Sequence, residues 1–321
     1  MNLIGEHTDY NGGLALPFAI ARGVTVTARP VDGDRVLALA RDLGEEDDFR
    51  PGDRCGADGW RAFVRGVAAE LGVSGARAEI EGDLPRGSGL GSSAALSTAL
   101  CLAFLALRGE EMDRLELARL CSRVENEWVG AHTGLLDQLA ALCCRPDHAL
   151  RIDFESLELT HVPLRLEGWT LATLDSGAGR ENAASGYNRR RAECADACEL
   201  LGVPSLAHAE SAEVPDPLDR RVRHVLEENA RVNAAVAALE RADLPELGRL
   251  LDASHASLRD LYEVSTPAVE RAVELMKEAG AVGARVVGGG FGGSVLGLFP
   301  PDRAPPTDAV VAEPGPAARL L

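Results

Sequence analysis

The sequence predicts a protein of the α+β class that folds into two domains. Its 321 residues, of which 46% are hydrophobic, are sufficient for two domains of ordinary size, each with its own core. Strand-like segments joined by turns dominate the first half, and helical patterns dominate the second half. The composition changes near residue 160, so we expect the two domains to comprise residues 1–160 and 161–321.

The first half alternates strands with helices. β-favouring residues interrupted by proline and glycine predict strands joined by tight turns. Apolar residues at helical spacing predict helices, one of which directly follows a strand and a glycine-rich loop. The predicted elements are strands over residues 14–41, 76–80 and 149–154 and helices over residues 60–71, 94–107 and 113–127.

Helices account for most of the second half. Two of them begin where a capping residue is followed by proline, in Asp243-Leu244-Pro245 and in Ser265-Thr266-Pro267. Two apolar strands near the end flank a run of glycines. The predicted elements are a helix over residues 180–201, three helical segments within residues 218–279, and strands over residues 171–175, 284–287, 294–299 and 309–312.

The charge balance limits the possible partners. Lys and Arg number 33 and Asp and Glu number 50, which gives a net charge of -17 and repels polyanions. We therefore expect neither a nucleic-acid partner nor a membrane partner, although backbone N–H groups and Mg²⁺ can still hold phosphate locally. The sequence shows no secretory leader and no apolar run of spanning length, so we expect a cytoplasmic protein. Seven cysteines without a CxxC pair indicate reduced thiols and no zinc site.

The segment from Gly87 to Ser93 has the features of a phosphate site. Its glycines allow the backbone to approach a ligand, and the following helix offers free N–H groups and a positive dipole end. Its spacing matches neither the Walker pattern nor the dinucleotide fingerprint. A helix cap by Ser92 or Ser93 after a glycine turn is the alternative. Gly288 to Gly293 allows two interpretations as well, a hairpin-like turn or a loop that closes over phosphate.

Two further segments concentrate polar groups. Glu6, His7 and Asp9 are crowded between apolar residues and a glycine pair, which suits hydrogen bonding to a polyhydroxylated ligand, although a capped polar turn gives the same pattern. Asp137 lies in an apolar neighbourhood, where an ionised carboxylate needs a partner or a function. Glu125 lies on a predicted helix 12 residues upstream. Taken alone, both acids are equally consistent with surface or capping roles.

Taken together and in order, these segments resemble the GHMP kinase superfamily and, within it, the galactokinase family. Asn2 to Tyr10 is similar to the galactokinase N-terminal box, Pro85 to Ala94 to the ATP loop of the superfamily, and Gly288 to Gly293 to its third motif. The stretches 125–138 and 175–191 agree as well. The resemblance therefore covers nearly the whole chain.

The resemblance implies a fold, a reaction and a set of site residues. The fold is a two-domain GHMP kinase fold, with an N-terminal domain like the second domain of ribosomal protein S5 and a ferredoxin-like C-terminal domain. The reaction is ATP-dependent phosphorylation of D-galactose at the C1 hydroxyl, with Mg²⁺, and the partners are a small sugar and ATP; a monomer is expected. The implied roles are Asp137 as the catalytic residue, Glu6, His7, Thr8, Asp9, Gly134 and Tyr187 in sugar binding, Gly87, Ser88, Gly89, Leu90, Gly91, Ser92 and Ser93 in ATP binding, and Ser93 and Glu125 as Mg²⁺ ligands.

The catalytic role implied for Asp137 fits the chemistry of phosphoryl transfer. This reaction depends mainly on positioning and charge neutralisation, so a carboxylate need only orient the C1 hydroxyl and accept its proton late. An aspartate with an unperturbed pKa of about 3.9 is already ionised at neutral pH.

The start of the chain departs from the galactokinase pattern. Galactokinases carry an arginine directly before the segment that corresponds to Asn2 onward, and Met1 stands at that position here. Since a cation there contributes strongly to phosphoryl transfer, we expect either that the start has been placed too late in the gene or that the enzyme is impaired. The missing arginine leaves open a non-catalytic sensor that binds galactose and ATP. A kinase for N-acetylgalactosamine or L-arabinose is a further alternative, because such kinases share much of the N-terminal box.

Overall fold

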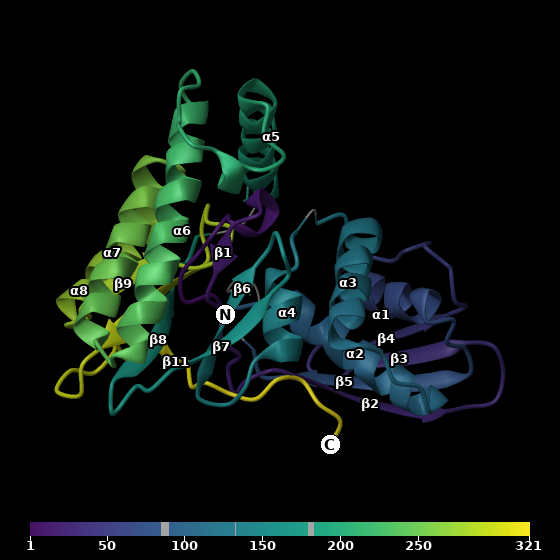
Figure 1. The fold of residues 1–321 in the computed structure, drawn as a ribbon. Helices are drawn as coiled ribbons and strands as arrows, with labels where there is room; N and C mark the ends of the chain where they lie inside the picture. The colour runs from purple at the N-terminus through teal and green to yellow at the C-terminus, as the bar shows by residue number, and fades with distance from the viewer. Residues whose placement is uncertain (85–89, 132, 179–182) are drawn as a thin grey trace. The chain divides into compact units, whose positions relative to one another are not determined.

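The computed structural model describes residues 1–84, 90–131, 133–178 and 183–321, which divide into two compact units (Figure 1). One unit combines Met1–Ala21 with Cys144–Gly315, and the other holds most of the chain from Arg22 to Cys143 together with Pro316–Leu321. Helices and sheets occur in both, which confirms the predicted α+β class. The boundary near residue 160 divides the chain differently from these compact units and stays a prediction.

The unit that begins at Arg22 is a four-stranded sheet covered by helices (Figure 1). The strand order is β2-β5-β3-β4, with β3 and β5 parallel and the other neighbours antiparallel. Buried and partly exposed residues alternate along β3 and β5, so one face of the sheet supplies the core that the helices cover. The elements are β2 (Val24–Pro30), β3 (Val36–Ala40), β4 (Glu45–Phe49), β5 (Ala76–Gly82), α1 (Gly59–Glu70), α2 (Ser92–Arg108), α3 (Arg114–Val124) with a π-helical turn (Glu125–Val129), and α4 (Leu136–Cys143).

Strand β4 was not predicted because four of its five residues are acidic. Its inward residue Asp47 is buried, and both of its carboxylate oxygens accept hydrogen bonds from Arg65 of α1, at 2.8 and 2.7 Å. A buried carboxylate is tolerated in such a bidentate pair. Neither β7 (Leu159–Pro163) nor α4 was predicted either, since α4 has only eight residues and β7 contains His161 and Pro163.

The unit that contains both the first 21 residues and Cys144–Gly315 holds two antiparallel sheets and four of the α-helices (Figure 1). One sheet has the order β1-β6-β7 and the other has the order β11-β8-β10-β9. Helices α6 and α7 pack on each other, and α7 and α8 pack on β9. The elements are β1 (Leu14–Ala15), β6 (His148–Asp153), β7 (Leu159–Pro163), β8 (Thr170–Asp175), β9 (Gly283–Val286), β10 (Ser294–Phe299), β11 (Val310–Val311), α5 (Ala183–Leu201), α6 (Leu218–Glu240), α7 (Leu244–Asp260), α8 (Pro267–Glu278) and two 3-10 turns (Asp9–Asn11 and Leu206–His208).

Helices α7 and α8 begin as the sequence predicts. The Asp243 side chain accepts a hydrogen bond from the Glu246 N–H at 3.1 Å, and the Thr266 hydroxyl accepts one from the Val269 N–H at 3.4 Å. A proline occupies the first or second helical position in each, where its missing N–H carries no cost. Within the described ranges, none of the helices combines the length and the apolar character needed to cross a bilayer.

Candidate active site

The N-terminal polar box forms a tight loop at the end of a short hairpin. The Leu3 N–H donates to the Leu16 carbonyl and the Phe18 N–H donates to the Met1 carbonyl, so the two arms pair. Thr8 is fully buried, and its hydroxyl contacts the carbonyls of Gly5 at 2.9 Å and Leu14 at 2.7 Å. These bonds give Thr8 a structural reason to be in the loop, while its contact with a sugar stays a prediction.

Glu6 is buried and held by the strand and turn that lead into the glycine run. Its Oε1 accepts a hydrogen bond from the Gly288 N–H at 2.8 Å and forms an ion pair with Arg285 at 3.1 Å. Arg285 is fully buried on β9 and also donates to the Leu3 carbonyl at 2.8 Å. The carboxylate orientation is therefore set by two donors that are close together in sequence.

His7 lies in the left-handed region, with φ of 61°, and its side chain is buried. A residue other than glycine in this region is uncommon, and such strain is concentrated at functional sites. Burial lowers the pKa of His7 to about 3, and His224, Arg190 and Arg285 act in the same direction. The imidazole is consequently neutral at physiological pH, and it can donate at one ring nitrogen and accept at the other.

Tyr187 of α5 and the glycine run lie against this box. The Tyr187 ring centroid is 5.3 Å from that of His7 and 5.6 Å from that of Tyr10. A Cβ added to Gly289 would approach the Tyr187 ring to 2.9 Å, so the backbone of the glycine run packs directly on the aromatic ring. Three predicted sugar-binding residues, Glu6, His7 and Tyr187, are thus brought together in one unit with the third motif; Asp9 opens the 3-10 turn of the same loop.

Close packing explains several glycines of the run from Gly288 to Gly293. Gly290 has φ of 72°, and a Cβ there would lie 2.6 Å from the Val264 Cβ. Gly292 has φ of 135°, and a Cβ there would lie 3.1 Å from the Ala178 carbonyl oxygen. The run is therefore a tightly packed turn that also anchors Glu6 through Gly288, and its predicted closure over phosphate stays a prediction.

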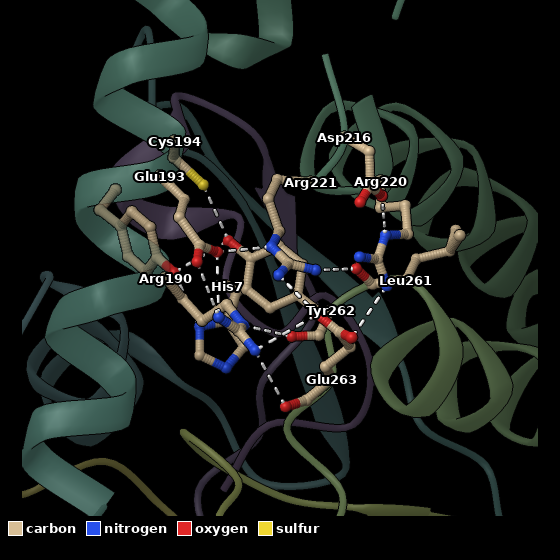
Figure 2. A network of polar contacts seen from close by, with 11 residues as sticks. His7, Arg190, Glu193, Cys194, Asp216, Arg220, Arg221, Leu261, Tyr262 and Glu263 are labelled. Carbon is tan, nitrogen blue, oxygen red and sulfur yellow. Dashed lines mark hydrogen bonds and ion pairs between the residues drawn. The ribbon is translucent and has the colours of Figure 1, made fainter. Parts of the chain in front are cut away.

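A cluster of buried ion pairs supports the box from α5 and α6 (Figure 2). The Glu193 carboxylate pairs with Arg190 at 2.9 Å and with Arg221 at 2.7 Å. Arg190 donates to the Tyr262 carbonyl and Arg221 donates to the Leu261 carbonyl, so both guanidinium groups also fix the turn after α7. These contacts place the Tyr262 side chain against His7.

The other unit brings Gly91 and Asp137 together. Gly91 precedes α2 with φ of 72°, and a Cβ there would lie 3.3 to 3.5 Å from the Asp137 carboxylate atoms. Asp137 is in the first turn of α4, and α4 packs on α2. The end of the predicted ATP loop and the predicted catalytic carboxylate are therefore neighbours.

Glu125 lies close to Asp137 in this unit. Its Oε2 accepts hydrogen bonds from the Gln138 amide at 2.6 Å and from the Thr133 hydroxyl at 2.9 Å. Burial raises the pKa of Glu125 to about 7, and the Asp137 charge acts in the same direction. Two carboxylates thus lie near each other in a partly desolvated environment.

The remaining predicted site residues are only partly covered by the structure. Gly87, Ser88 and Gly89 lie outside the described residues. Ser92 and Ser93 occupy the first turn of α2, whose N-terminal N–H groups are available to an anion, and Leu90 is buried. Gly134 lies two residues before α4. Among the residues that the structure describes, no group of three or more His, Cys, Asp or Glu side chains forms a metal site.

Sequence reasoning missed Arg285, Tyr262 and Gln138. Arg285 is the single charged residue in a strand of four buried residues, and a charge in such a strand signals a buried partner. Tyr262 is one of only three tyrosines in the chain. Gln138 follows the predicted catalytic residue, and nothing in the sequence distinguished it.

Family models match three parts of the chain. Residues 60–145 match the GHMP kinases N terminal domain, and residues 235–310 match the GHMP kinases C terminal model. Residues 1–30 match the galactokinase galactose-binding signature. The last match covers the hairpin that carries Glu6 and His7.

Whole proteins with similar sequences are galactokinases. The galactokinase of Thermotoga neapolitana is 39% identical over 307 residues, which cover 93% of this chain and 87% of that protein. The galactokinase of Mycobacterium bovis is 42% identical over 322 residues, with 95% and 88% coverage.

Solved structures agree with these relatives. The galactokinase of Lactococcus lactis in complex with galactose superposes with a TM-score of 0.91 at 31% identity, over 100% of this chain and 92% of that chain. The mevalonate kinase of Methanococcus jannaschii has a TM-score of 0.67 at 19% identity over 94% and 89%, so it shares the fold. The predicted two-domain GHMP kinase fold is confirmed.

Proposed function

The chain belongs to the galactokinase family, and on this premise we propose that it transfers the γ-phosphoryl group of ATP to the C1 hydroxyl of galactose. The observation that carries the proposal is the galactose-binding signature over residues 1–30, together with relatives that are similar over nearly their whole length. ATP-dependent galactose phosphorylation is the activity of this chain.

The sugar contacts are proposed for the side chains that the hairpin and α5 present. The Glu6 carboxylate, already oriented by Arg285 and Gly288, would accept a hydrogen bond from a sugar hydroxyl, and neutral His7 would add one hydrogen bond. Tyr187 would pack beside them. The full proposed set is Glu6, His7, Thr8, Asp9, Gly134 and Tyr187.

Asp137 is proposed as the catalytic residue. Its position beside Gly91 supports this role, because Gly91 closes the predicted ATP loop and has no side chain to separate the carboxylate from a bound phosphate. The carboxylate would orient the C1 hydroxyl for attack and take its proton as the bond to phosphorus forms. The ATP phosphates would be held by the backbone N–H groups of Gly87 to Ser93 and by the N-terminus of α2.

Ser93 and Glu125 are proposed to hold Mg²⁺. The donor set fits a hard cation, which prefers carboxylate and hydroxyl oxygens and keeps water and phosphate in its remaining positions. Burial beside Asp137 disfavours the charge of Glu125 and raises its pKa, and a divalent cation bound there would lower that pKa again. When bound, Mg²⁺ would neutralise phosphate charge during transfer.

The cellular setting is proposed from the thiols. The seven cysteines are present as thiols, and four of them are buried, which suits a reducing cytoplasm. A monomer is proposed and can be checked by sedimentation.

A coupled assay of ADP release tests the proposed function. Purified protein is expected to release ADP with galactose and to be slower with N-acetylgalactosamine and L-arabinose. Asp137→Asn, which keeps the size of the side chain, is expected to lower kcat by orders of magnitude while binding of galactose persists. A faster rate with another sugar, or full activity of the variant, would contradict the assignment of substrate or of catalytic residue respectively.

A further inference from the structure

All three tyrosines of the chain meet at one histidine. The centroid of the His7 ring lies 5.9 Å from Tyr10, 5.3 Å from Tyr187 and 4.7 Å from Tyr262. Tyr10 belongs to the N-terminal box, Tyr187 to α5, and Tyr262 to the turn after α7. Three elements that are far apart in the sequence therefore each supply their tyrosine to the same side chain.

Two of these tyrosines form a hydrogen-bonded line that ends at His7, and Figure 2 shows the contact of Cys194 with Tyr262 at its other end. The Cys194 thiol lies 3.0 Å from the Tyr262 hydroxyl, and that hydroxyl lies 3.0 Å from the Tyr10 hydroxyl. The Tyr10 hydroxyl lies 2.8 Å from Nδ1 of His7. Cys194 and Tyr262 are buried, so water does not compete for these positions.

Tyr262 cannot easily leave this line, because charged side chains hold its backbone. Arg190 donates to its carbonyl oxygen and also to the Glu263 carbonyl at 3.2 Å. Arg221, which is 1% exposed, donates to the Leu261 carbonyl and pairs with the Glu263 carboxylate at 2.6 Å. The turn is fixed on both sides of Tyr262, and its hydroxyl has a defined place.

The direction of the line decides which nitrogen of His7 carries the proton. Because the ring is neutral, Nδ1 accepts from Tyr10 or donates to it, and each choice orients every hydroxyl in the line. If Nδ1 donated, Tyr10 would donate to Tyr262, and Tyr262 would donate to the sulfur of Cys194. The thiol is a weak partner in either direction, so the contact of Tyr10 with the ring decides the order. A phenol O–H is a better donor to an imidazole nitrogen than an imidazole N–H is to a phenol oxygen, so the favoured order ends with Tyr10 donating to Nδ1.

The other side of the ring agrees with this direction. The backbone of Gly289 lies beside His7 and favours a proton on the imidazole. Nε2 is buried and has no partner in hydrogen-bond geometry among the residues that the structure describes. A proton on Nε2 is therefore covered in the free protein, and a ligand oxygen accepts it only where the ligand displaces the residues that cover it.

We propose that Tyr262 is a positioning residue that acts through Tyr10 to keep the proton of the His7 ring on Nε2, so that His7 presents an N–H donor to a hydroxyl oxygen of the sugar. The statement about the sugar rests on the proposed function, whereas the statement about the proton concerns the free protein. Glu6 is an acceptor and His7 is a donor in this arrangement. The pair can therefore bind two hydroxyl groups of one sugar ring, one that donates to Glu6 and one that accepts from His7.

The proton position is tested by nitrogen NMR of the full chain with ¹⁵N-labelled histidine. The His7 signals are assigned by their loss in His7→Gln. In the wild-type protein without ligand, Nε2 is expected to show a protonated, pyrrole-type signal and Nδ1 an unprotonated, pyridine-type signal. The reverse pattern would overturn the proposal without any variant of Tyr262.

Tyr262→Phe tests the positioning role, since it keeps the ring and removes the hydroxyl. We expect its His7 signals to shift toward a mixture of both tautomers, and the Kd for galactose, measured by calorimetry, to rise roughly two- to tenfold for one lost hydrogen bond. The KM for ATP should stay unchanged. Cys198→Ala is the control, because Cys198 lies on α5 four residues after Cys194 but outside the line, and it should leave the tautomer and the Kd unchanged.

The outcomes separate this proposal from the proposed function. A variant that keeps both the wild-type tautomer and the wild-type Kd would refute the role of Tyr262. A wild-type protein with the proton on Nε2 but without galactose binding would refute the proposed substrate and leave the role of Tyr262 in fixing the tautomer supported.

Discussion

The buried histidines beneath the N-terminal box should make the folded protein sensitive to mild acid. His224 of α6 is fully buried and bonds to the Ser257 hydroxyl at 2.8 Å and to the Glu6 carbonyl at 3.1 Å. Burial lowers the pKa of His224 from 6.5 to about 4. The unfolded chain therefore binds a proton that the folded chain excludes, and stability is complete above pH 6.5 and falls as the pH drops from there toward 4.

The size of the effect follows from the two pKa values. Between about pH 7.5 and 5.5, one such histidine lowers the free energy of unfolding by about 1.4 kcal/mol. His7, whose pKa burial lowers to about 3, adds a similar amount, so the two together lower it by about 3 kcal/mol. Buried Glu228, whose pKa is lowered, loses its stabilising charge only below the ordinary glutamate range near 4.5. Glu125, whose pKa burial raises to about 7, takes up a proton in the folded state within the same window and offsets about 2 kcal/mol of the loss, so the contribution of a histidine is measured as a difference between variants.

Urea unfolding followed by circular dichroism at the two pH values provides the assay. His224→Gln removes the titrating group, so the variant is expected to be less stable at pH 7.5 but to lose about 1.4 kcal/mol less than wild type on acidification. Ser257→Ala is the control, because it removes a hydrogen bond to His224 and leaves the imidazole in place; it should retain the full pH dependence. Equal losses in wild type and His224→Gln would refute the reasoning.

Two further predictions concern glycines. Gly91→Ala should lower the kcat for galactose at least tenfold in the ADP-release assay, because its methyl group would press on the Asp137 carboxylate, while the positive φ costs only about 1–2 kcal/mol of stability; an unchanged kcat would contradict the proposed site. Gly283→Ala should lose about 3 kcal/mol or more in urea unfolding, since its Cβ would lie 2.0 Å from the Gly248 carbonyl oxygen. Gly23→Ala, with no atom within 4 Å, should stay within about 0.5 kcal/mol of wild type, and similar losses in both would argue against this packing.

Local patterns predicted most elements because periodicity, caps and prolines act within a few residues. The helix starts at Asp243 and Thr266 are examples, since each cap bonds to an N–H three residues away. Strand β4 was missed by the prediction for the opposite reason. Its inward Asp47 is stabilised by Arg65, 18 residues away, and no local pattern reveals such a pair.

The candidate site shows the same division between local and distant information. The box was visible in the sequence because Glu6, His7 and Asp9 are adjacent polar residues in a glycine-bounded segment. The residues that hold the box in place could not be identified from the sequence, since the Gly288 N–H that binds Glu6 is 282 residues away. The sequence therefore left two interpretations of the glycine run open, a hairpin-like turn or a loop that closes over phosphate, whereas the structure shows that its glycines pack closely and contact the box.

The supports also indicate why the box has its present conformation. Burying the charges of Glu6 and Arg285 costs free energy that their mutual attraction only partly restores, and a left-handed His7 adds strain. Apolar residues in the same positions would give a more stable hairpin, so stability alone does not account for these side chains. Unfavourable local choices that several distant residues hold in place are expected where a protein binds its ligand. The anchoring of Glu6 and the hydroxyl line to His7 are thus two parts of one arrangement, which under the proposed function fixes an acceptor and a donor before a sugar arrives.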